Sequence, residues 1–278
     1  MIFLDSRFLD VRAYLIAYLI TSFFGLCIGS FLNVCIYRIP KGESLVKRSS
    51  HCMTCGTKIR FYDLVPVFSW LFLKGKCRGC GEKISGRYPL VESLNCVLYL
   101  LVLTFVDVFT YPVHGLITAI SFSLLIVIGF IDYDTMEIYG SHLVMLAVLA
   151  VLSAIFTDVL TIPERLIGAV CISVPFFIIG EVSTIYTKKK YGERIRGIEL
   201  GDTLLMLCAG LLIGTKCIVA SAFIGIFTAA VVGVIGKIRG KESKISFGPY
   251  LAIGIVFGTL WGNQIIDWYM SLFTYPQV

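Results

Sequence analysis

Charged residues are scarce in this sequence, and their scarcity excludes the soluble globular class. Only 15% of the 278 residues are charged, whereas 57% are hydrophobic, and the mean hydropathy is +0.87. A soluble domain usually carries about 25% charged residues, so the composition indicates a polytopic membrane protein. The net charge of +6 does not indicate a nucleic-acid partner, because the basic residues lie in loops between apolar segments and not on one soluble face.

Histidine is scarce as well, which argues against a histidine-dependent nucleophile. His51, His114 and His142 fall in different loops or at a span end, so no serine or cysteine has an evident histidine base. A clear basic region is missing from residues 1–12, and the apolar run after them is too long for a cleaved signal peptide. We therefore expect that run to be a retained first span.

Long apolar runs are abundant, and a spanning helix needs about 20 such residues. Eight segments qualify or nearly qualify. We place them near 11–37, 90–109, 115–131, 138–157, 166–186, 202–215, 217–236 and 248–268. Glycines at four-residue spacing, such as Gly25 and Gly29, favour close packing between helices of one bundle. The sequence thus predicts an all-α membrane protein with about eight transmembrane helices.

The orientation follows from the basic residues, which stay on the cytoplasmic side of a membrane. The loops 38–89, 187–201 and 237–247 hold eleven, five and four of the 24 Lys and Arg residues. These loops alternate with loops that hold almost none. We therefore expect these three loops in the cytoplasm and both termini outside.

Four of the ten cysteines have the spacing of metal ligands: Cys52, Cys55, Cys77 and Cys80. Two CxxC knuckles can close a tetrahedral thiolate site that leaves no open position for hydrolytic chemistry. The loop that carries them has too few residues for a large core. We therefore predict a structural zinc ion that staples the loop, and the alternative is a redox or disulfide function. The other cysteines lie singly in apolar segments, where cysteine behaves as a small hydrophobe.

Two aspartates lie where an apolar run meets a predicted cytoplasmic loop. Asp132 follows the run that starts at Ser121, and Asp202 precedes another. Carboxylates are costly at such places unless they are solvated or functional. Close together, two carboxylates resist double ionisation, so one keeps its proton while the other activates water. We predict that Asp132 and Asp202 form a catalytic pair. Asp134 lies about 200° further around the helix and should face away.

These residues together resemble the bifunctional type IV prepilin peptidases. The resemblance rests on residues 29–40 (GSFLNVCIYRIP), the four cysteines, 62–70 (YDLVPVFSW), 75–78 (GKCR), 84–92 (ISGRYPLVE), Ile131-Asp132 and Gly201-Asp202. It covers most of the first ~140 residues and the second aspartate.

The resemblance implies a function for each part of the chain. It implies cleavage of a short basic leader from prepilins or pseudopilins at the cytoplasmic face of the bacterial inner membrane, with Asp132 and Asp202 as the catalytic aspartates. It also implies N-methylation of the new N-terminal residue by S-adenosylmethionine. Arg87 and Glu92 are our candidates for binding that methyl donor, because no glycine-rich adenosine-binding motif is present. Membrane lipid is the other expected partner.

The chain departs from the family at both aspartates. The family usually has Leu-Pro-Asp after its first aspartate, where this chain has Ile138-Tyr139-Gly140. It usually has GxGD at the second, with a lysine two positions on, where this chain has Glu199 in the first position and Leu204. Glu199 is therefore expected to change the electrostatics around Asp202.

We predict three parts: a first span (1–37), a cytoplasmic zinc-binding loop associated with methyl transfer (38–89) and an aspartyl peptidase bundle (90–278). Two other functions stay open. A proton-coupled transporter would need carboxylates near mid-span, whereas these lie at span ends. A non-catalytic pilus-assembly factor would keep the fold without the chemistry.

Overall fold

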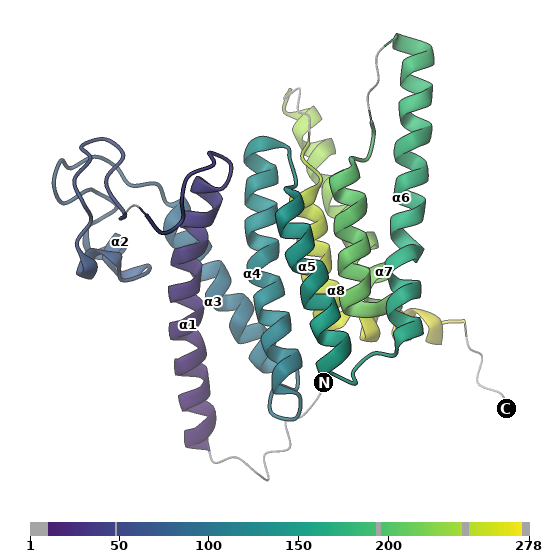
Figure 1. Cartoon of the computed structure of the whole chain (residues 1–278), viewed down its shortest axis with the longest axis horizontal. Coiled ribbons are helices and arrows are strands. Elements are labelled where there is room, and N and C mark those ends of the chain that lie inside the picture. Colours follow the sequence, from purple (N-terminus) through teal and green to yellow (C-terminus); the bar gives the residue numbers. More distant parts are fainter. Residues whose placement is uncertain (1–10, 48, 193–195, 241–244, 274–278) are drawn as a thin grey trace. The chain divides into compact units, whose positions relative to one another are not determined.

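The computed structural model describes residues 11–47, 49–192, 196–240 and 245–273, and in these ranges the chain is helical and contains no strand. The predicted all-α class is confirmed. Figure 1 shows the elements α1 (Val11–Arg38), η1 (Phe61–Leu64), α2 (Phe68–Phe72), α3 (Arg87–Phe105), α4 (Pro112–Thr135), α5 (Gly140–Phe156), α6 (Ile162–Tyr191), α7 (Leu200–Ile238) and α8 (Gly248–Ser271).

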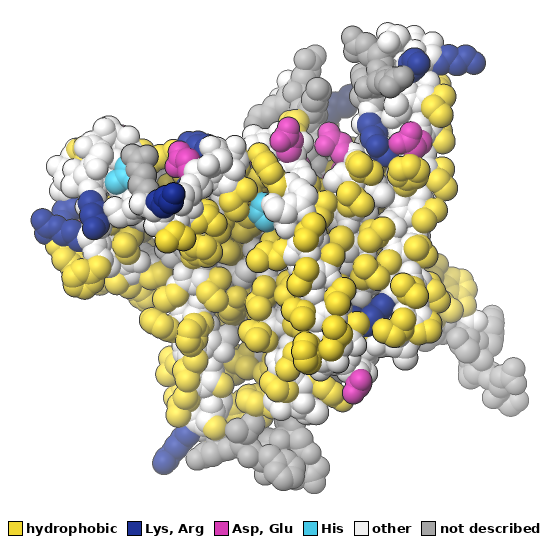
Figure 2. Space-filling view, in the orientation of Figure 1, with side chains coloured by type: hydrophobic (Ala, Val, Ile, Leu, Met, Phe, Trp, Pro, Cys, Tyr) yellow, Lys and Arg dark blue, Asp and Glu magenta, His cyan; other side chains and the backbone are white. Residues whose placement is uncertain are grey.

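Six of these helices are long and apolar enough to cross a membrane: α1, α3, α4, α6, α7 and α8. Helix α5 is apolar but has only 17 residues. On the face shown in Figure 2, hydrophobic side chains cover the sides of the helices. The chain is therefore a multi-pass membrane protein, but the predicted count of eight spans is not confirmed.

The count differs because the predicted spans 202–215 and 217–236 lie in one helix, α7, which is broken at Gly214. Gly214 has φ 76° and ψ 179°, a backbone conformation that essentially only glycine adopts. The segment before the break packs against α6, where Gly210 closely approaches Gly168. The segment after the break packs along α8, where Cys217 lies beside Gly262 and Gly225 beside Leu251.

The chain reverses its direction at this break. Thr215 donates a hydrogen bond to the carbonyl of Glu164, near the start of α6, and Lys216 pairs with Asp267, near the end of α8. The second segment then runs back toward the start of α8, because Gly233 lies beside Ile245. The two predicted spans therefore correspond to the two segments of α7.

A buried arginine caps the first of these segments. Arg165 donates hydrogen bonds to the carbonyl oxygen of Leu211 and to Ser153 Oγ, both at 3.1 Å. In an unbroken helix the amide of Thr215 would bind this carbonyl. A cation at the C-terminal end of a helix is also favoured by the helix dipole. Arg165 thus joins α5, α6 and α7 where the backbone of α7 is interrupted.

The predicted close packing at glycines is confirmed. A Cβ atom on Gly25 would lie 2.8 Å from the Cα of Cys96, and one on Gly29 would lie 2.7 Å from the Cα of Glu92. Helices α1 and α3 therefore approach each other too closely for a side chain at either glycine. These glycines serve packing within the chain.

The chain divides within α4 into two compact units, Met1–Val127 and Ile128–Val278. The first unit contains the cysteine-rich loop and a buried polar network, in which Asn95 donates to the carbonyl of Gly25 at 2.8 Å and accepts from Ser123 at 2.7 Å. The second unit contains the end of α4 and all of α5 to α8. Both predicted catalytic aspartates belong to this second unit.

Candidate active site and metal site

The first predicted aspartate, Asp132, lies in the last turn of α4 and is 4% exposed. Its Oδ2 atom accepts a hydrogen bond of 2.9 Å from the backbone amide of Gly248, which is 116 residues further along the chain. Gly248 is the first residue of α8 and Pro249 is the second. The first amides of a helix have no partner within the helix and favour a negative charge. The start of α8 therefore holds and orients the carboxylate of Asp132.

This contact leaves no room for a side chain at position 248. A Cβ atom there would lie 2.6 Å from Asp132 Oδ2 and 3.0 Å from its carboxyl carbon. Glycine lets one backbone come this close to a functional group. Gly248 was not predicted from the sequence. The only local signal is the Gly-Pro pair, which marks a helix start but not its partner.

The second predicted aspartate, Asp202, is the third residue of α7 and is 5% exposed. It forms a reciprocal capping box with Glu199. The backbone amide of Glu199 donates to Asp202 Oδ2 at 3.3 Å, while the carboxylate of Glu199 accepts the backbone amide of Asp202. Such a box satisfies two amides at a helix start and fixes both side chains. The departure at Glu199 therefore has a structural function next to Asp202.

The start of α7, which carries Asp202, contacts the segment that directly follows α4. A Cβ atom on Gly201, the residue before Asp202, would lie 2.9 Å from the Cβ of Ile138, just beyond the end of α4. Asp132 and Asp202 interact electrostatically with each other, and Glu199 interacts with both. The structure thus brings the two predicted aspartates together at one end of the second unit.

Each aspartate has one oxygen that is held and one that is available. Both Oδ2 atoms accept backbone amides, and no described residue donates a hydrogen bond to either Oδ1 atom. Two carboxylates near each other share a proton because both cannot ionise at low cost. Such a pair can take a proton from water with one member and donate a proton with the other, as hydrolysis of an amide requires.

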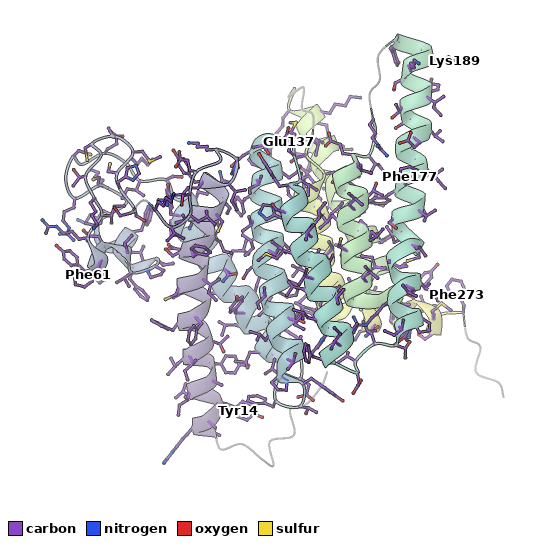
Figure 3. The ribbon with its side chains drawn as sticks, viewed as in Figure 1. Tyr14, Phe61, Glu137, Phe177, Lys189 and Phe273 are labelled. Carbon is purple, nitrogen blue, oxygen red and sulfur yellow. The ribbon has the colours of Figure 1, made fainter. Side chains whose placement is uncertain are left out.

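The neighbouring acidic residues are more exposed. Asp134 is exposed while Asp132 is buried, which confirms that residues two positions apart face different sides of α4. Glu137 is also exposed and lies just beyond α4 in Figure 3. Met136, between them, has φ 56°, so the chain turns sharply as soon as α4 ends. Neither acid is buried with the pair.

The four predicted metal ligands form one cluster. The Sγ atoms of Cys52, Cys55, Cys77 and Cys80 all lie within 4.8 Å of one another, and those of Cys52 and Cys80 are 3.8 Å apart. Zinc–sulfur bonds of about 2.3 Å in a tetrahedron place sulfur atoms about 3.8 Å apart. The cluster could therefore hold a metal ion, and its geometry fits zinc.

The backbone of each knuckle explains the glycine that follows it. Gly56 and Gly81 have φ of 69° and 73°, which glycine adopts without strain. Their amides donate to the carbonyls of Cys52 and Cys77, both at 2.9 Å. His51 hydrogen-bonds through Nδ1 to the carbonyl of Ser49 and is not one of the clustered ligands.

The two predicted methyl-donor residues lie on α3. Arg87 is the first residue of the helix and is half-buried. Glu92 is buried, and its Oε2 atom accepts the backbone amide of Val67 at 2.6 Å. Glu92 thus connects the cysteine-rich loop to α3. A role for either residue in binding a methyl donor stays a prediction.

Six long apolar helices make the chain a polytopic membrane protein, and its second unit buries the two aspartates predicted to be catalytic. The family model described as Bacterial Peptidase A24 N-terminal domain matches residues 23–106. The family model described as Type IV leader peptidase family matches residues 119–234. The chain belongs to the Type IV leader peptidase family.

Several relatives of similar length are named prepilin leader peptidase/N-methyltransferase. The protein of that name from Dichelobacter nodosus is 33% identical, over 87% of this chain and 91% of the relative. The one from Aeromonas hydrophila is 30% identical over 90% and 92%. The one from Bacillus subtilis (strain 168) is 27% identical over 90% and 96%. No solved structure matches the chain.

Proposed function

We propose that this protein removes the leader from prepilins or pseudopilins and N-methylates the new N-terminus. The observation that carries the proposal is the pair Asp132 and Asp202, two buried carboxylates on adjoining helix ends, each held by one backbone amide. The family and the names of its relatives support the same activity. A transporter is less well supported, since both acids lie at helix ends.

In the proposed peptidase step, one aspartate is ionised and the other is protonated. The ionised carboxylate takes a proton from a water molecule, whose oxygen attacks the carbonyl carbon of the scissile bond, while the protonated one donates to the carbonyl oxygen. The C–N bond then breaks as the amine nitrogen takes the proton held by the first aspartate, while the second aspartate takes back a hydroxyl proton from the tetrahedral intermediate. The amides of Gly248 and Glu199 keep the two carboxylates in position throughout.

The proposed site faces the cytoplasm of the bacterial inner membrane. At about 1.5 Å per residue, the stretch from Gly248 to Asp267 spans about 28 Å, close to the ~30 Å hydrocarbon core of a bilayer. Asp132 lies at the Gly248 end, and the basic residues Lys188, Lys189 and Lys190 lie in the last turn of α6. Because basic residues stay inside, this charge distribution favours a cytoplasmic site.

We assign to the loop 38–89 a structural metal site and a part in methyl transfer. Zinc held by the four cysteines would fold residues 38–89 and leave no open coordination position. S-adenosylmethionine would supply the methyl group, with Arg87 as the proposed contact and Glu92 holding the loop against α3. Residues 1–37 and 90–278 would then be the first span and the peptidase bundle.

The proposal is tested by supplying a prepilin to membranes that contain the protein and a labelled methyl donor. We expect loss of the leader on a gel and a mass gain of one methyl group on the mature N-terminus. A stably inserted protein that produces neither change would instead be a non-catalytic assembly factor.

A further inference from the structure

The cysteine-rich loop exposes an apolar surface that the proposed chemistry does not use. Phe61 and Phe72 are each 84% exposed, and neither is a member of the four-cysteine cluster. We call the exposed large side chains of η1, α2 and the turn between them the apolar patch: Phe61, Tyr62, Leu64, Val65, Phe68, Leu71 and Phe72. Four of these side chains, those of Tyr62, Val65, Phe68 and Phe72, line one hollow, and an exposed apolar surface of this kind marks a contact with a membrane or a partner.

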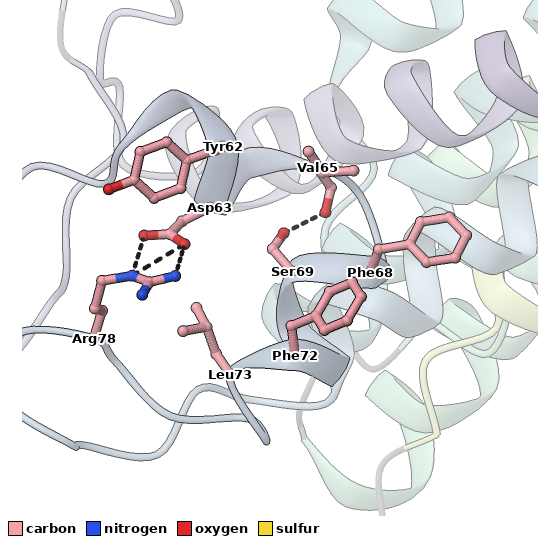
Figure 4. Close-up of a pocket in the computed structure, with 8 residues that line it drawn as sticks. All are labelled: Tyr62, Asp63, Val65, Phe68, Ser69, Phe72, Leu73 and Arg78. Atoms are coloured by element: carbon pink, nitrogen blue, oxygen red, sulfur yellow. Dashed lines mark hydrogen bonds and ion pairs between the residues drawn. The ribbon is translucent and has the colours of Figure 1, made fainter.

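The patch is part of a folded surface. Asp63 and Arg78 form a bidentate ion pair with a shortest distance of 2.6 Å, and these hydrogen bonds from Arg78 hold the pKa of Asp63 below its usual range. Trp70 Nε1 donates to the carbonyl of Ile84 at 3.2 Å. The residues of η1 and α2 line a hollow of about 240 Å³. Figure 4 shows the Asp63–Arg78 ion pair at one end of these residues and Phe68 and Phe72 at the other.

The charge around the patch is almost entirely positive. Lys58 and Arg60 precede it, Lys74 and Lys76 follow it, and all four are exposed. The one acidic residue between positions 58 and 76 is Asp63, which Arg78 neutralises. Figure 3 places Phe61 on the edge of the loop that faces along α1 toward Tyr14, and Figure 2 shows hydrophobic and basic side chains gathered there.

One hydrogen bond fixes the depth of the patch along a spanning helix. The amide of Val67, directly before α2, donates to Glu92 at 2.6 Å, and Glu92 is the sixth residue of the spanning helix α3. Five residues correspond to about 8 Å along the helix axis. Interfacial helices bury their apolar face about 5–10 Å into the boundary between headgroups and acyl chains. Measured from the first residue of α3, the start of α2 therefore lies at a comparable distance along the helix axis.

We propose that the apolar patch inserts into the membrane interface beside α3, and that the flanking lysine and arginine side chains bind anionic phospholipid headgroups. Aromatic rings favour this layer, and basic residues near the surface are attracted to anionic lipid. Together with the Val67–Glu92 hydrogen bond, the patch would hold the metal-binding loop flat against the membrane. This inference is independent of the proposed peptidase activity.

A photo-cross-linking residue tests the proposal directly. We would replace Phe72 with p-benzoylphenylalanine in the full chain, place the protein in nanodiscs that contain phosphatidylglycerol, and irradiate it. Val46, which is 90% exposed on the same loop, is the matched control position. We expect a mass gain of one phospholipid at position 72 and none at position 46, with less adduct when phosphatidylcholine replaces the anionic lipid.

The other possible occupants give different products. Cross-links only to a second copy of the chain, only to an added prepilin, or equal lipid adducts at both positions would overturn the proposal.

A second measurement does not depend on the unnatural residue. Phe61→Ser/Phe72→Ser should increase protease cleavage between residues 58 and 76 in anionic nanodiscs while the bound metal is kept, and Val46→Ser should not. Unchanged cleavage in the double variant would also contradict insertion.

Discussion

The backbone amide of Gly248 lies 2.9 Å from Asp132 Oδ2, so helix α8 begins next to a carboxylate in the last turn of α4. The amide holds one oxygen and leaves the other for water or substrate. An aspartate without such a contact could rotate, because its terminal torsion is broad. We therefore regard Gly248 as a residue that positions Asp132 and does not itself take part in proton transfer.

Gly248→Ala should lower kcat by about 10- to 100-fold, because a displacement of about 1 Å at a catalytic group can cost that much. The added Cβ would lie 2.6 Å from Asp132 Oδ2, so either the carboxylate or the start of α8 must move. Gly140→Ala is the control for a general effect of added methyl groups, since Gly140 is also the first residue of a helix and its Cβ would meet nothing within 4 Å. Steady-state cleavage of a prepilin in membranes measures both, and equal activity of the two variants would contradict a positioning function.

The aspartates and the cysteines could be predicted because each has a local signal in the sequence. For the aspartates the signal is the free-energy cost of a carboxylate beside an apolar run, and for the cysteines it is the spacing of metal ligands. Asp132 follows an apolar run and Asp202 precedes one, and at such places an ionised carboxylate costs free energy unless it is solvated or functional. Cys52 and Cys55 repeat the spacing of Cys77 and Cys80. These signals need no knowledge of the fold.

The contacts between distant residues could not be predicted in this way. Gly248 is 116 residues from Asp132, and only the packing of α8 against α4 pairs them. The break at Gly214 was not predicted either. Two spans were expected on either side of this short stretch, but the sequence does not reveal that a single glycine with φ 76° reverses the chain there. The short helix α2 was not predicted, because its five residues are too few to show a helical period.

Glu199 is expected to act through its capping box. Glu199→Ala removes the acceptor for the Asp202 amide, and loss of a helix cap costs about 0.5–2 kcal/mol, so we expect a lower kcat and reduced thermal stability. Glu199→Gln removes the same charge but keeps an acceptor oxygen, and should retain most of the activity. Cleavage rates and melting temperatures of the two variants separate the effects. If both lose activity equally, the charge and not the cap is what matters.

The metal site predicts a defined stoichiometry. The purified protein should contain about one zinc ion per chain, and Cys77→Ser should lose it, because four thiolates close the site. Loss of the ion should also make residues 38–89 sensitive to protease, since metal binding contributes to folding. Cys27→Ser, outside the cluster, is the control. A metal-free wild-type loop that resists protease would show that the thiolates serve another purpose.

The topology predicts which loops a reporter finds in the cytoplasm. Fusions after Lys76 and Lys190 should report the cytoplasm, and a fusion at Val113 should report the outside, because basic residues are retained inside. The activity of an alkaline phosphatase fusion and the fluorescence of a fluorescent-protein fusion at each position distinguish the two sides. An external reporter after Lys190 would place the Asp132 and Asp202 end of the second unit outside and contradict the proposed site.

Asp132 and Asp202 should act as one catalytic unit. Asp132→Asn and Asp202→Asn should each reduce cleavage by about 10⁴-fold or more, and the double variant should be no worse, since members of a catalytic unit are not additive. Asp134→Asn is the matched control on the same helix and should be mild, because Asp134 is exposed. Methylation of a pre-cleaved pilin should survive both aspartate variants if methyl transfer uses the loop. Leader loss and methyl gain are therefore measured separately in membranes with equal amounts of each variant. Full cleavage by inserted Asp132→Asn would refute the pair, whereas loss of methylation together with cleavage would refute separate sites.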